Sequence, residues 1–178
     1  FRTRAPPREL WAIASVGSEP ELLFEFPAGT TDVTAISRDG STIAALRRGD
    51  DGMAGVWTAR MPGGTLQRYT TAPFESRLWA NTPHLSFSPN GHQLLLVWNT
   101  GAGDQAWLLQ YPADPARAPE QILRNLPMFG FTPEFSWMPD GRHVVVSTSE
   151  QGGPRRLYLA DTVSDEFRLL TSGTSPYV

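Results

Sequence analysis

Short apolar runs alternate with turn-forming residues along the whole chain, and no stretch combines helical periodicity with helix caps. Some runs alternate apolar and polar residues, as a strand with one buried face does, and others are almost continuously apolar, as a strand buried on both faces is. The alternating runs are Val33 to Ser37, His84 to Ser88 and Glu134 to Met138, and the continuous runs are Thr42 to Leu46, Gln93 to Trp98 and His143 to Val146. Because each alternating run is closely followed by a continuous one, the pattern predicts three hairpins.

Three tight turns connect these paired runs. They are Ser37-Arg38-Asp39-Gly40, Ser88-Pro89-Asn90-Gly91 and Met138-Pro139-Asp140-Gly141. Asp-Gly and Asn-Gly are strong hairpin signals, because glycine readily adopts the positive φ of the turn and Asp or Asn tolerates it. The structural turn residues are therefore Asp39, Gly40, Asn90, Gly91, Asp140 and Gly141. The three glycines are 51 and 50 residues apart, which indicates a repeat of about fifty residues.

An aromatic series keeps the same phase as the turns. Its members are Trp11, Trp57, Trp107 and Tyr158, and each of the last three follows its turn glycine by 16 or 17 residues. Pro83 and Pro133 form another series, since each precedes its turn glycine by 8 residues. We predict that the four aromatic residues pack between neighbouring sheets.

Each repeat therefore contains four strands, which we call a to d, with the aromatic residue on strand c. Strand d is predicted at Leu66 to Thr70, Gln121 to Arg124 and Phe167 to Thr171. The predicted fold class is all-β, a β-propeller segment of about three and a half four-stranded antiparallel blades. A plain β-sandwich would explain the strands but not the fifty-residue phase.

The repeat also predicts the blade boundaries. Residues 1–30 form a partial blade (the end of strand b, then strands c and d), residues 31–81, 82–131 and 132–173 form blades, and residues 174–178 begin a further one. Because Phe1 to Arg4 resembles the end of a strand b and Pro176 aligns with Pro83, we expect a fragment of a ring of about six to eight blades. Exposed sheet faces and edges would favour self-association of such a fragment.

The amino-acid composition excludes several classes of function. The formal net charge is −3 and no basic run exceeds two residues, so the chain lacks the concentrated positive field of a nucleic-acid-binding protein. There is no Cys, which excludes disulfides and thiol chemistry. No apolar run approaches membrane-spanning length, so we expect no membrane insertion. All the basic residues are Arg, which suggests a GC-rich, bacterial gene.

The repeat resembles that of the TolB-like propeller family, which reads roughly Pro-x-x-Trp-Ser-Pro-Asp-Gly, then an apolar run, Leu-Tyr, a turn and Arg-Leu-Thr. The matching segments are Pro133 to Gly141, Arg156-Leu157-Tyr158 and Arg168 to Thr171. The copy from Pro83 to Gly91 has Phe87 in place of Trp, and the first copy has Ile36 there. The resemblance implies scaffolding and interaction more than catalysis, and favours a periplasmic or extracytoplasmic location while leaving a cytoplasmic one open.

Catalytic and metal motifs are missing from the sequence. There is no Gly-x-Ser-x-Gly nucleophile elbow. His84, His92 and His143 occupy different positions of the repeat, so we interpret them as structural strand-end residues rather than metal ligands. Gly101 to Ala106 superficially resembles a dinucleotide fingerprint but joins two strands instead of a strand and a helix. We expect no catalytic residue, metal or cofactor.

Binding is expected on the face that carries the longer connectors, because the a–b turns on the other face are minimal. Two of these connectors, Thr71 to Thr82 and Asn125 to Thr132, carry apolar residues that have no role in the repeat. They are Phe74, Leu78, Trp79, Met128, Phe129 and Phe131. We predict Arg77, Trp79, Phe129 and Phe131 as binding residues for a protein, a peptide or a small ligand. Trp98, at the end of a strand b, is equally consistent with binding and with packing.

Three functions remain open at this point. The first is a non-catalytic sensor or scaffold propeller within a larger bacterial protein. The second is the substrate-gating propeller of a prolyl-oligopeptidase-type serine peptidase whose catalytic domain lies outside this chain. The third is a propeller enzyme with carboxylates near the axis, for which only Asp32 and Glu134 lie near the start of a strand a.

Overall fold

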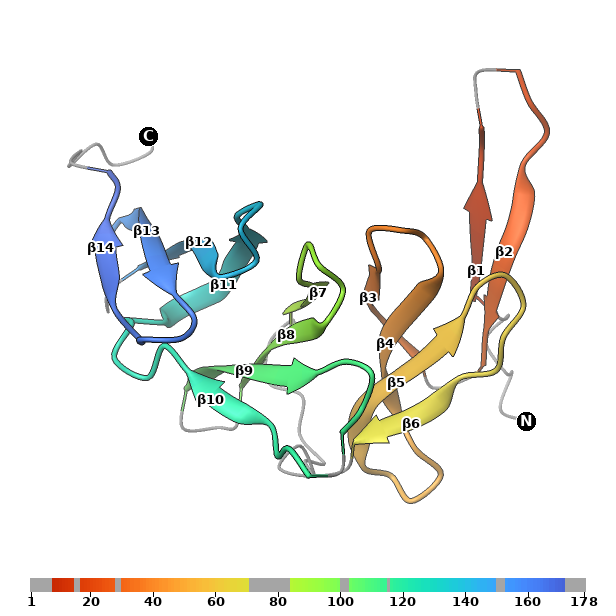
Figure 1. Cartoon of the computed structure of the whole chain (residues 1–178), viewed down its shortest axis with the longest axis horizontal. Coiled ribbons are helices and arrows are strands. Elements are labelled where there is room, and N and C mark those ends of the chain that lie inside the picture. Colours follow the sequence, from red (N-terminus) through yellow and green to blue (C-terminus); the bar gives the residue numbers. More distant parts are fainter. Residues whose placement is uncertain are drawn as a thin grey trace. The chain divides into compact units, whose positions relative to one another are not determined.

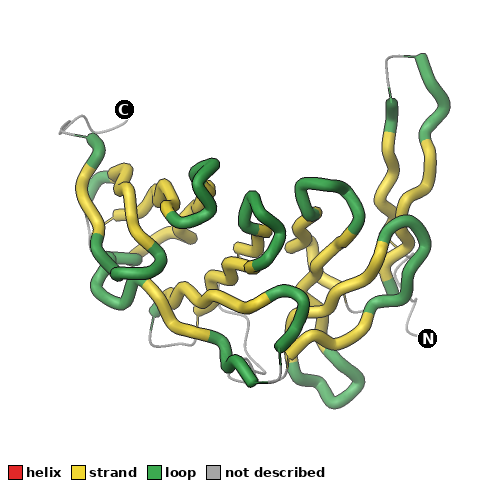
Figure 2. The backbone as a smooth tube through the Cα atoms, in the orientation of Figure 1, coloured by secondary structure: helices red, strands yellow, loops and turns green. Residues whose placement is uncertain are grey.

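The structure, a computed structural model, describes residues 8–14, 17–27, 30–70, 84–99, 103–114, 116–149 and 153–171. The described residues form strands and turns, with no helix among them (Figures 1 and 2). The strands are β1 (Arg8–Ala12), β2 (Glu21–Phe26), β3 (Thr30–Ile36), β4 (Thr42–Arg48), β5 (Ala54–Arg60), β6 (Gln67–Thr70), β7 (His84–Phe87), β8 (Gln93–Asn99), β9 (Asp104–Gln110), β10 (Glu120–Ile122), β11 (Phe129–Trp137), β12 (His143–Ser149), β13 (Arg155–Asp161) and β14 (Phe167–Leu169). The expected all-β class is confirmed.

Within the described ranges the strands form three four-stranded sheets and one two-stranded sheet. Each sheet consists of strands consecutive in sequence, β1–β2, β3–β6, β7–β10 and β11–β14, and every pairing is antiparallel. This is the up-and-down order of propeller blades. Residues 1–75 and 76–178 form two compact units, and each is described by itself.

Strands b and c extend further than their apolar runs. β4 continues through Arg48 and β12 through Ser149, and the ladder from β12 to β13 reaches Arg155. The connector between β12 and β13 is therefore shorter than the apolar runs alone indicate. Polar residues are compatible with these strand ends because the ladder is continued by backbone hydrogen bonds, which do not depend on the side chain.

The three predicted a–b turns share one backbone pattern. Gly40, Gly91 and Gly141 have φ values of 71°, 73° and 66°, a left-handed conformation that glycine adopts without steric cost. Each glycine N–H donates to the carbonyl of the residue three positions earlier, Ser37, Ser88 or Met138.

A further backbone bond ties each of these turns to the end of strand c. The N–H groups of Met61, Tyr111 and Thr162 donate to the carbonyls of Ser41, His92 and Arg142 at 2.8, 2.7 and 3.1 Å. The donors directly follow strand c, and the acceptors directly follow the turn glycines. The a–b turn and the c–d turn of each sheet are therefore joined through main-chain atoms.

In the first unit, the β1–β2 sheet packs against one face of the β3–β6 sheet. The buried cluster consists of Phe24, Phe26, Ile43, Ala45, Ala59 and Leu66, with Leu10, Trp57 and Met61 partly buried against it. A backbone bond from the Gly63 N–H to the Leu23 carbonyl (3.2 Å) joins the c–d turn of the larger sheet to β2.

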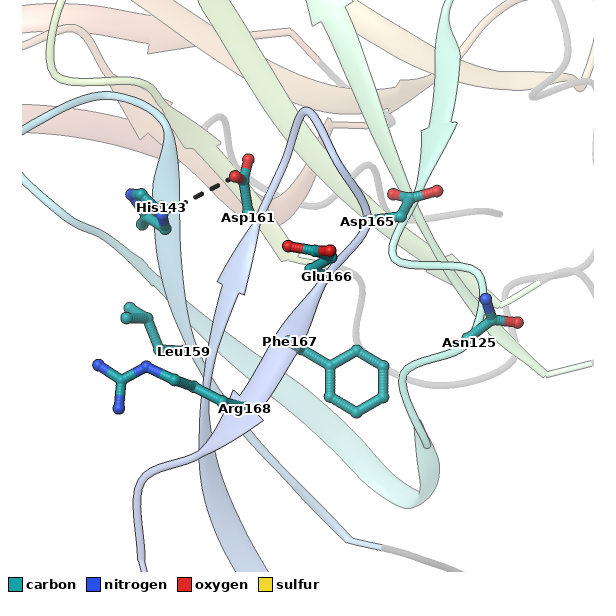
Figure 3. Close-up of a pocket in the computed structure, with 8 residues that line it drawn as sticks. All are labelled: Asn125, His143, Leu159, Asp161, Asp165, Glu166, Phe167 and Arg168. Carbon is teal, nitrogen blue, oxygen red and sulfur yellow. Dashed lines mark ion pairs between the residues drawn. The ribbon is translucent and has the colours of Figure 1, made fainter.

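In the second unit, hydrogen bonds join the linker that follows the β7–β10 sheet to the β11–β14 sheet. The Asp165 carboxylate, in the β13–β14 turn, accepts a bond from the Leu123 N–H at 2.6 Å. Figure 3 shows Asp165 facing the segment that carries Asn125. The Thr148 hydroxyl donates to the Pro127 carbonyl at 2.9 Å. The linker after β10 is therefore fixed to the following sheet by hydrogen bonds.

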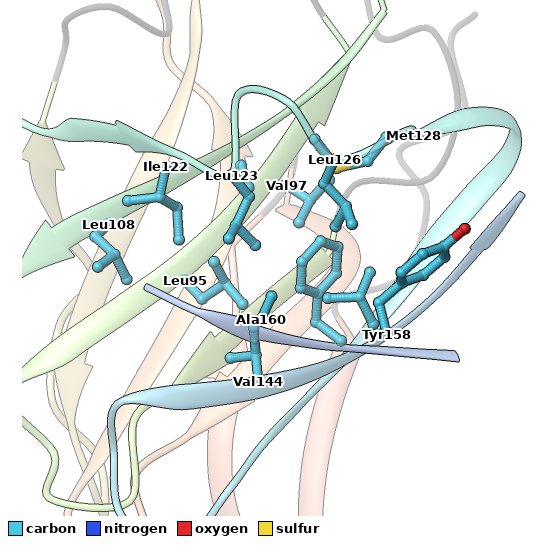
Figure 4. Packing of buried hydrophobic residues seen from close by; sticks show 13 residues of the cluster. Leu95, Val97, Leu108, Ile122, Leu123, Leu126, Met128, Val144, Tyr158 and Ala160 are labelled. Carbon is cyan, nitrogen blue, oxygen red and sulfur yellow. The ribbon is translucent and has the colours of Figure 1, made fainter. Parts of the chain in front are cut away.

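The main core of this unit fills the space between the same two sheets (Figure 4). It is made of Leu95, Val97, Ala106, Leu108, Ile122, Leu123, Leu126, Met128, Phe135, Val144, Val146, Tyr158 and Ala160. The first five come from the β7–β10 sheet, the next three from the linker and the last five from the β11–β14 sheet. One sheet thus buries its face against the next, as the repeat predicts.

Candidate functional site

The predicted binding residues lie largely outside the described part of the chain. Arg77 and Trp79, together with Phe74 and Leu78, fall outside the described residues. Phe129 and Phe131 belong to β11, and the Phe129 backbone pairs with Ser149, but their side chains are outside the description. Their binding role stays a prediction.

Met128, an apolar connector residue without a predicted role in the repeat, has a packing role. It is buried in the core of the second unit together with Leu126 from the same connector. The connector therefore serves as a packing element, because it crosses from one sheet to the next over their shared apolar interior. Trp98 is also buried, so its role is one of packing.

The aromatic series occupies different environments. Tyr158 is 5% exposed in the core of the second unit, and Trp57 is partly buried against the core of the first. Trp107 is partly buried as well. Trp11 differs, because its side chain is 49% exposed and its indole Nε1 donates to Glu9 Oε2 at 2.9 Å. The face of β1–β2 that carries Trp11 is opposite the one packed on β3–β6.

The turn acids are held by local hydrogen bonds. The Ser37 hydroxyl donates to Asp39 Oδ1 at 2.6 Å, and the Ser41 N–H and hydroxyl donate to the same carboxylate. These bonds lower the pKa of Asp39 from 3.8 to about 2. Asn90 makes the equivalent contacts in the second turn, accepting from the Ser88 hydroxyl at 2.7 Å and the His92 N–H at 3.0 Å.

The third turn carries a larger charged network. Asp140 accepts bonds from the N–H groups of His143 and Arg142, both at 2.9 Å, and lies 2.6 Å from His143 Nδ1. These three contacts lower the pKa of Asp140 to about 2. Arg142 Nε lies 3.0 and 2.9 Å from the two carboxylate oxygens of Asp161. Bonding to this guanidinium holds the pKa of Asp161 well below its usual range and raises that of Arg142.

A cavity of about 490 Å³ opens around the β13–β14 hairpin (Figure 3). It is lined by Asn125, His143, Leu159, Asp161, Asp165, Glu166, Phe167 and Arg168. Leu159 pairs with Arg168 and Ala160 with Phe167, so the lining includes side chains from both faces of the hairpin. The cavity is a polar hollow around a turn, and two of its carboxylates are already engaged, Asp161 by Arg142 and Asp165 by the Leu123 N–H.

Several described side chains were candidates for catalysis or metal binding. His84 has a lowered pKa because it is buried, and its ring lies 5.8 Å from that of Phe135. Glu134, considered for an axial carboxylate site, is exposed and lies 3.8 Å from Arg155, and the Asp32 side chain is not described. In the described part of the chain, no three His, Cys, Asp or Glu side chains gather as metal ligands would. Nor does that part contain a helix long and apolar enough to cross a membrane.

Reasoning from the sequence missed the hollow around the β13–β14 hairpin. His143 was interpreted as a strand-end residue, and Asp161, Asp165 and Glu166 belong to no repeated motif. Their proximity follows from the register of β12 with β13, which pairs His143 with Asp161. An Asp-rich c–d turn, Asp161 to Asp165, was the available signal.

The fold has clear relatives among solved structures. No family model and no curated protein matches the chain. The putative TolB from Agrobacterium tumefaciens is similar, with a TM-score of 0.68 at 17% identity over 94% of this chain and 56% of that one. TolB from Acinetobacter baumannii has a TM-score of 0.61 at 14% identity over 89% of this chain and 37% of that one.

The chain has the fold of a TolB-like β-propeller. It spans between about a third and just over half of the length of these TolB structures. A chain from a structural analysis of two prolyl endopeptidases is also similar, with a TM-score of 0.61 at 14% identity over 93% of this chain and 26% of that one. At these identities the likeness establishes the fold alone, and the TolB-like propeller resemblance is confirmed at that level.

Proposed function

We propose that this TolB-like propeller segment is a non-catalytic binding module for a protein, a peptide or a small ligand, within a larger bacterial sensor or scaffold protein. The observation that carries the proposal is the bonding of its acids: Asp39 and Asp140 accept hydrogen bonds within their own turns, and Asp161 is bound by Arg142, so these carboxylates serve the framework. Asp39, Asp51, Asp140 and Asp161 all have lowered pKa values, because hydrogen bonds or Arg side chains stabilise the charged form. A general acid would need a raised pKa instead.

The same bonds support a scaffold role. Each stabilises a turn or joins neighbouring strands; for example, Asp51 accepts from the Met53 N–H and from Arg68. A framework fixed in this way can present its connectors without rearranging, which lowers the entropic cost of binding. We assign the binding face to the longer connectors and the start of β11, with Arg77 and Trp79 from the former and Phe129 and Phe131 from the latter as the proposed anchors.

A displayed random peptide library provides the test. Peptides selected on the 178-residue chain should bind at least about tenfold more weakly to a Trp79→Ala/Phe129→Ala double variant, because aromatic anchors dominate such interfaces. The matched control is Val163→Ala, which shortens an apolar side chain that is 74% exposed in the β13–β14 turn. Thermal melting of each variant separates lost binding from lost folding. If the selected peptides bind the double variant as tightly as the wild type, this face is not the binding site.

The substrate-gating propeller of a serine peptidase is the second candidate, supported by the likeness to prolyl endopeptidases. The gating role requires a hydrolase domain with a serine nucleophile elbow in the same protein. The full reading frame around this segment distinguishes the candidates. A hydrolase domain adjacent to the propeller would favour gating, and a kinase, regulator or solely propeller sequence would favour the binding module.

A further inference from the structure

The chain leaves the β7–β10 sheet early, at Leu123. β10 pairs with β9 through only three residues, and the last pair is Ile122 with Ala106. β10 therefore ends short of the first two residues of β9, Asp104 and Gln105, although β9 pairs with β8 over its whole length. In the β1–β2 sheet, by contrast, all five residues of β1 pair with the outer strand.

A left-handed residue ends the strand at this point. Leu123 has a φ of 54°, which a residue with a Cβ rarely adopts because its side chain approaches the following carbonyl oxygen. Successive residues of a strand point to opposite faces, yet Ile122 and Leu123 both lie in one core, 1% and 0% exposed (Figure 4). The left-handed turn brings both side chains there, and Leu126 and Met128 follow them into the core.

A bond from the next sheet holds Leu123 in this conformation. Its N–H donates to Asp165 Oδ1 at 2.6 Å, and its carbonyl accepts from the Leu126 N–H at 3.0 Å. Asp165 itself has a positive φ of 61° in the β13–β14 turn, and Figure 3 shows it facing the linker after β10. Strained backbone persists only where the surrounding structure determines it. Here the Asp165 carboxylate and the burial of the Leu123 side chain together determine it.

The residues after Ile122 also fit a longer β10. Continuing the register of β10 with β9 sets Leu123 opposite Gln105 and Arg124 opposite Asp104. Opposite charges at directly opposed positions stabilise an antiparallel pair of strands. Leu123 would then have ordinary extended backbone, free of the steric cost of a positive φ. The same residues therefore have a second conformation, in which the backbone strain is relieved and the core contact of Leu123 is lost.

We propose that the linker after β10 is a two-state element, controlled by Asp165, that positions the start of β11 for binding. In the inserted state, Asp165 holds Leu123 left-handed and the linker runs through the core. In the extended state, β10 is longer by two residues. Because these residues are taken from the linker, the start of β11, where Phe129 pairs with Ser149, must shift. The effect on binding rests on the function proposed above, whereas the two states do not.

Amide hydrogen exchange resolved by NMR tests the role of Asp165. Asp165→Gly removes the carboxylate, and glycine adopts the φ of 61° without steric cost, so only the acceptor is lost. The Leu123 amide should then exchange at least about tenfold faster than in the wild type, because the bond that protects it is gone. Asp165→Asn is the matched control, since Asn keeps an oxygen acceptor and tolerates a positive φ. Equal exchange rates in the two variants would overturn the control by Asp165.

An engineered disulfide tests the extended state. The chain has no Cys, so Asp104→Cys/Arg124→Cys introduces a unique pair of thiols. Directly opposed residues of antiparallel strands lie within reach of a disulfide, so the pair can close when β10 is extended. Closure should be at least about tenfold faster in the Asp165→Gly background than in the Asp165→Asn background, since the extended state is then more populated. Equal rates in both backgrounds, or closure in neither, would overturn the two-state element.

The same disulfide connects the two states to binding. A peptide selected on the wild-type chain should bind the oxidised variant at least about tenfold more weakly, and reduction should restore its affinity. Unchanged affinity, or a loss that reduction does not reverse, would overturn the positioning of β11 by the linker.

Two further measurements keep the outcomes separate. Melting shows whether each variant folds, and Asp165→Ser, with a shorter polar side chain, replaces Asp165→Gly if that variant does not fold. If no selected peptide depends on Phe129, the proposed function fails, while hydrogen exchange and disulfide closure still decide whether the linker has two states.

Discussion

The second and third a–b turns belong to neighbouring sheets and have the same backbone, yet different side chains close them. In the second, the buried Ser88 hydroxyl donates to Asn90 and accepts from the Gln93 N–H at 3.0 Å. In the third, Met138 replaces the serine, and Asp140 itself accepts from the His143 N–H at 2.9 Å. One N–H donor of the turn is thus satisfied by a neutral hydroxyl in one sheet and by a carboxylate in the next.

This difference shows how a repeat can change its chemistry while keeping its shape. The side chains that close the second turn, Ser88 and Asn90, carry no charge. The third contains Asp140, Arg142 and His143, and Arg142 extends the network to Asp161 at the end of strand c. The third turn should therefore be more sensitive to pH and salt than the second.

The largest effect is expected from Ser88→Ala. Removing the hydroxyl deprives the Gln93 N–H of its acceptor at a buried position, and should lower the free energy of unfolding by about 1–3 kcal/mol. Urea denaturation measures the change. Ser37→Ala in the first turn is the matched variant, because the Thr42 N–H donates to Ser37 Oγ at 3.0 Å. Stability equal to the wild type in both variants would show that the hydroxyls do not close these turns.

A smaller effect on stability is expected from replacing Asp140 by Asn in the third turn and Asn90 by Asp in the second. The pKa of Asp140 is lowered from 3.8 to about 2, so its contribution to stability is complete above about pH 4 and is lost as the pH falls through about 2. Asp140→Asn should remove this acid-dependent loss, and Asn90→Asp should introduce one in the second turn.

Urea denaturation midpoints at pH 7, 4, 3 and 2 would measure how the stability of each variant changes with pH. Asp39 contributes a similar loss in the same window, since its pKa is also lowered to about 2. The background for both exchanges is therefore the Asp39→Asn variant. An unchanged acid profile for Asp140→Asn in that background would contradict the pKa assignment.

The smallest effect is expected from Met138→Ser. The new hydroxyl would find the His143 N–H already bonded to Asp140, so the free energy of unfolding should stay within about 0.5 kcal/mol of the wild type. The same denaturation series measures it. If Met138→Ser raised the free energy of unfolding by as much as Ser88→Ala lowers it, Asp140 would be shown to close the turn poorly.

Much of the fold was predictable from the sequence, because its signals are local. The Asp-Gly and Asn-Gly turns and the continuous apolar runs give each hairpin directly. The ends of strands b and c were not predictable, because residues such as Arg48 and Ser149 continue the ladder through backbone atoms alone. The burial of Met128 depends on the path of a connector between two sheets, which periodicity does not encode.

The candidate site was less predictable than the fold. His143 and Asp161 are brought together by strand register, and the bond from the Leu123 N–H to Asp165, which spans 42 residues, brings the linker after β10 to the same turn. The exposure of Trp11 was missed because its place in the aromatic series indicates only the orientation of the side chain. Whether another sheet covers it depends on which surface it meets.

The bond that joins each a–b turn to the end of strand c bears on how this repeat can diverge. Its acceptors belong to Ser41, His92 and Arg142, three unlike residues, and the bond uses only their carbonyl oxygens. Substitution at this position leaves the connection intact, so mutation can change its charge and size without disturbing the blade. Within this single chain, one structural position has already taken a hydroxyl, an imidazole and a guanidinium, and the last of these gave the third sheet its ion pair with Asp161.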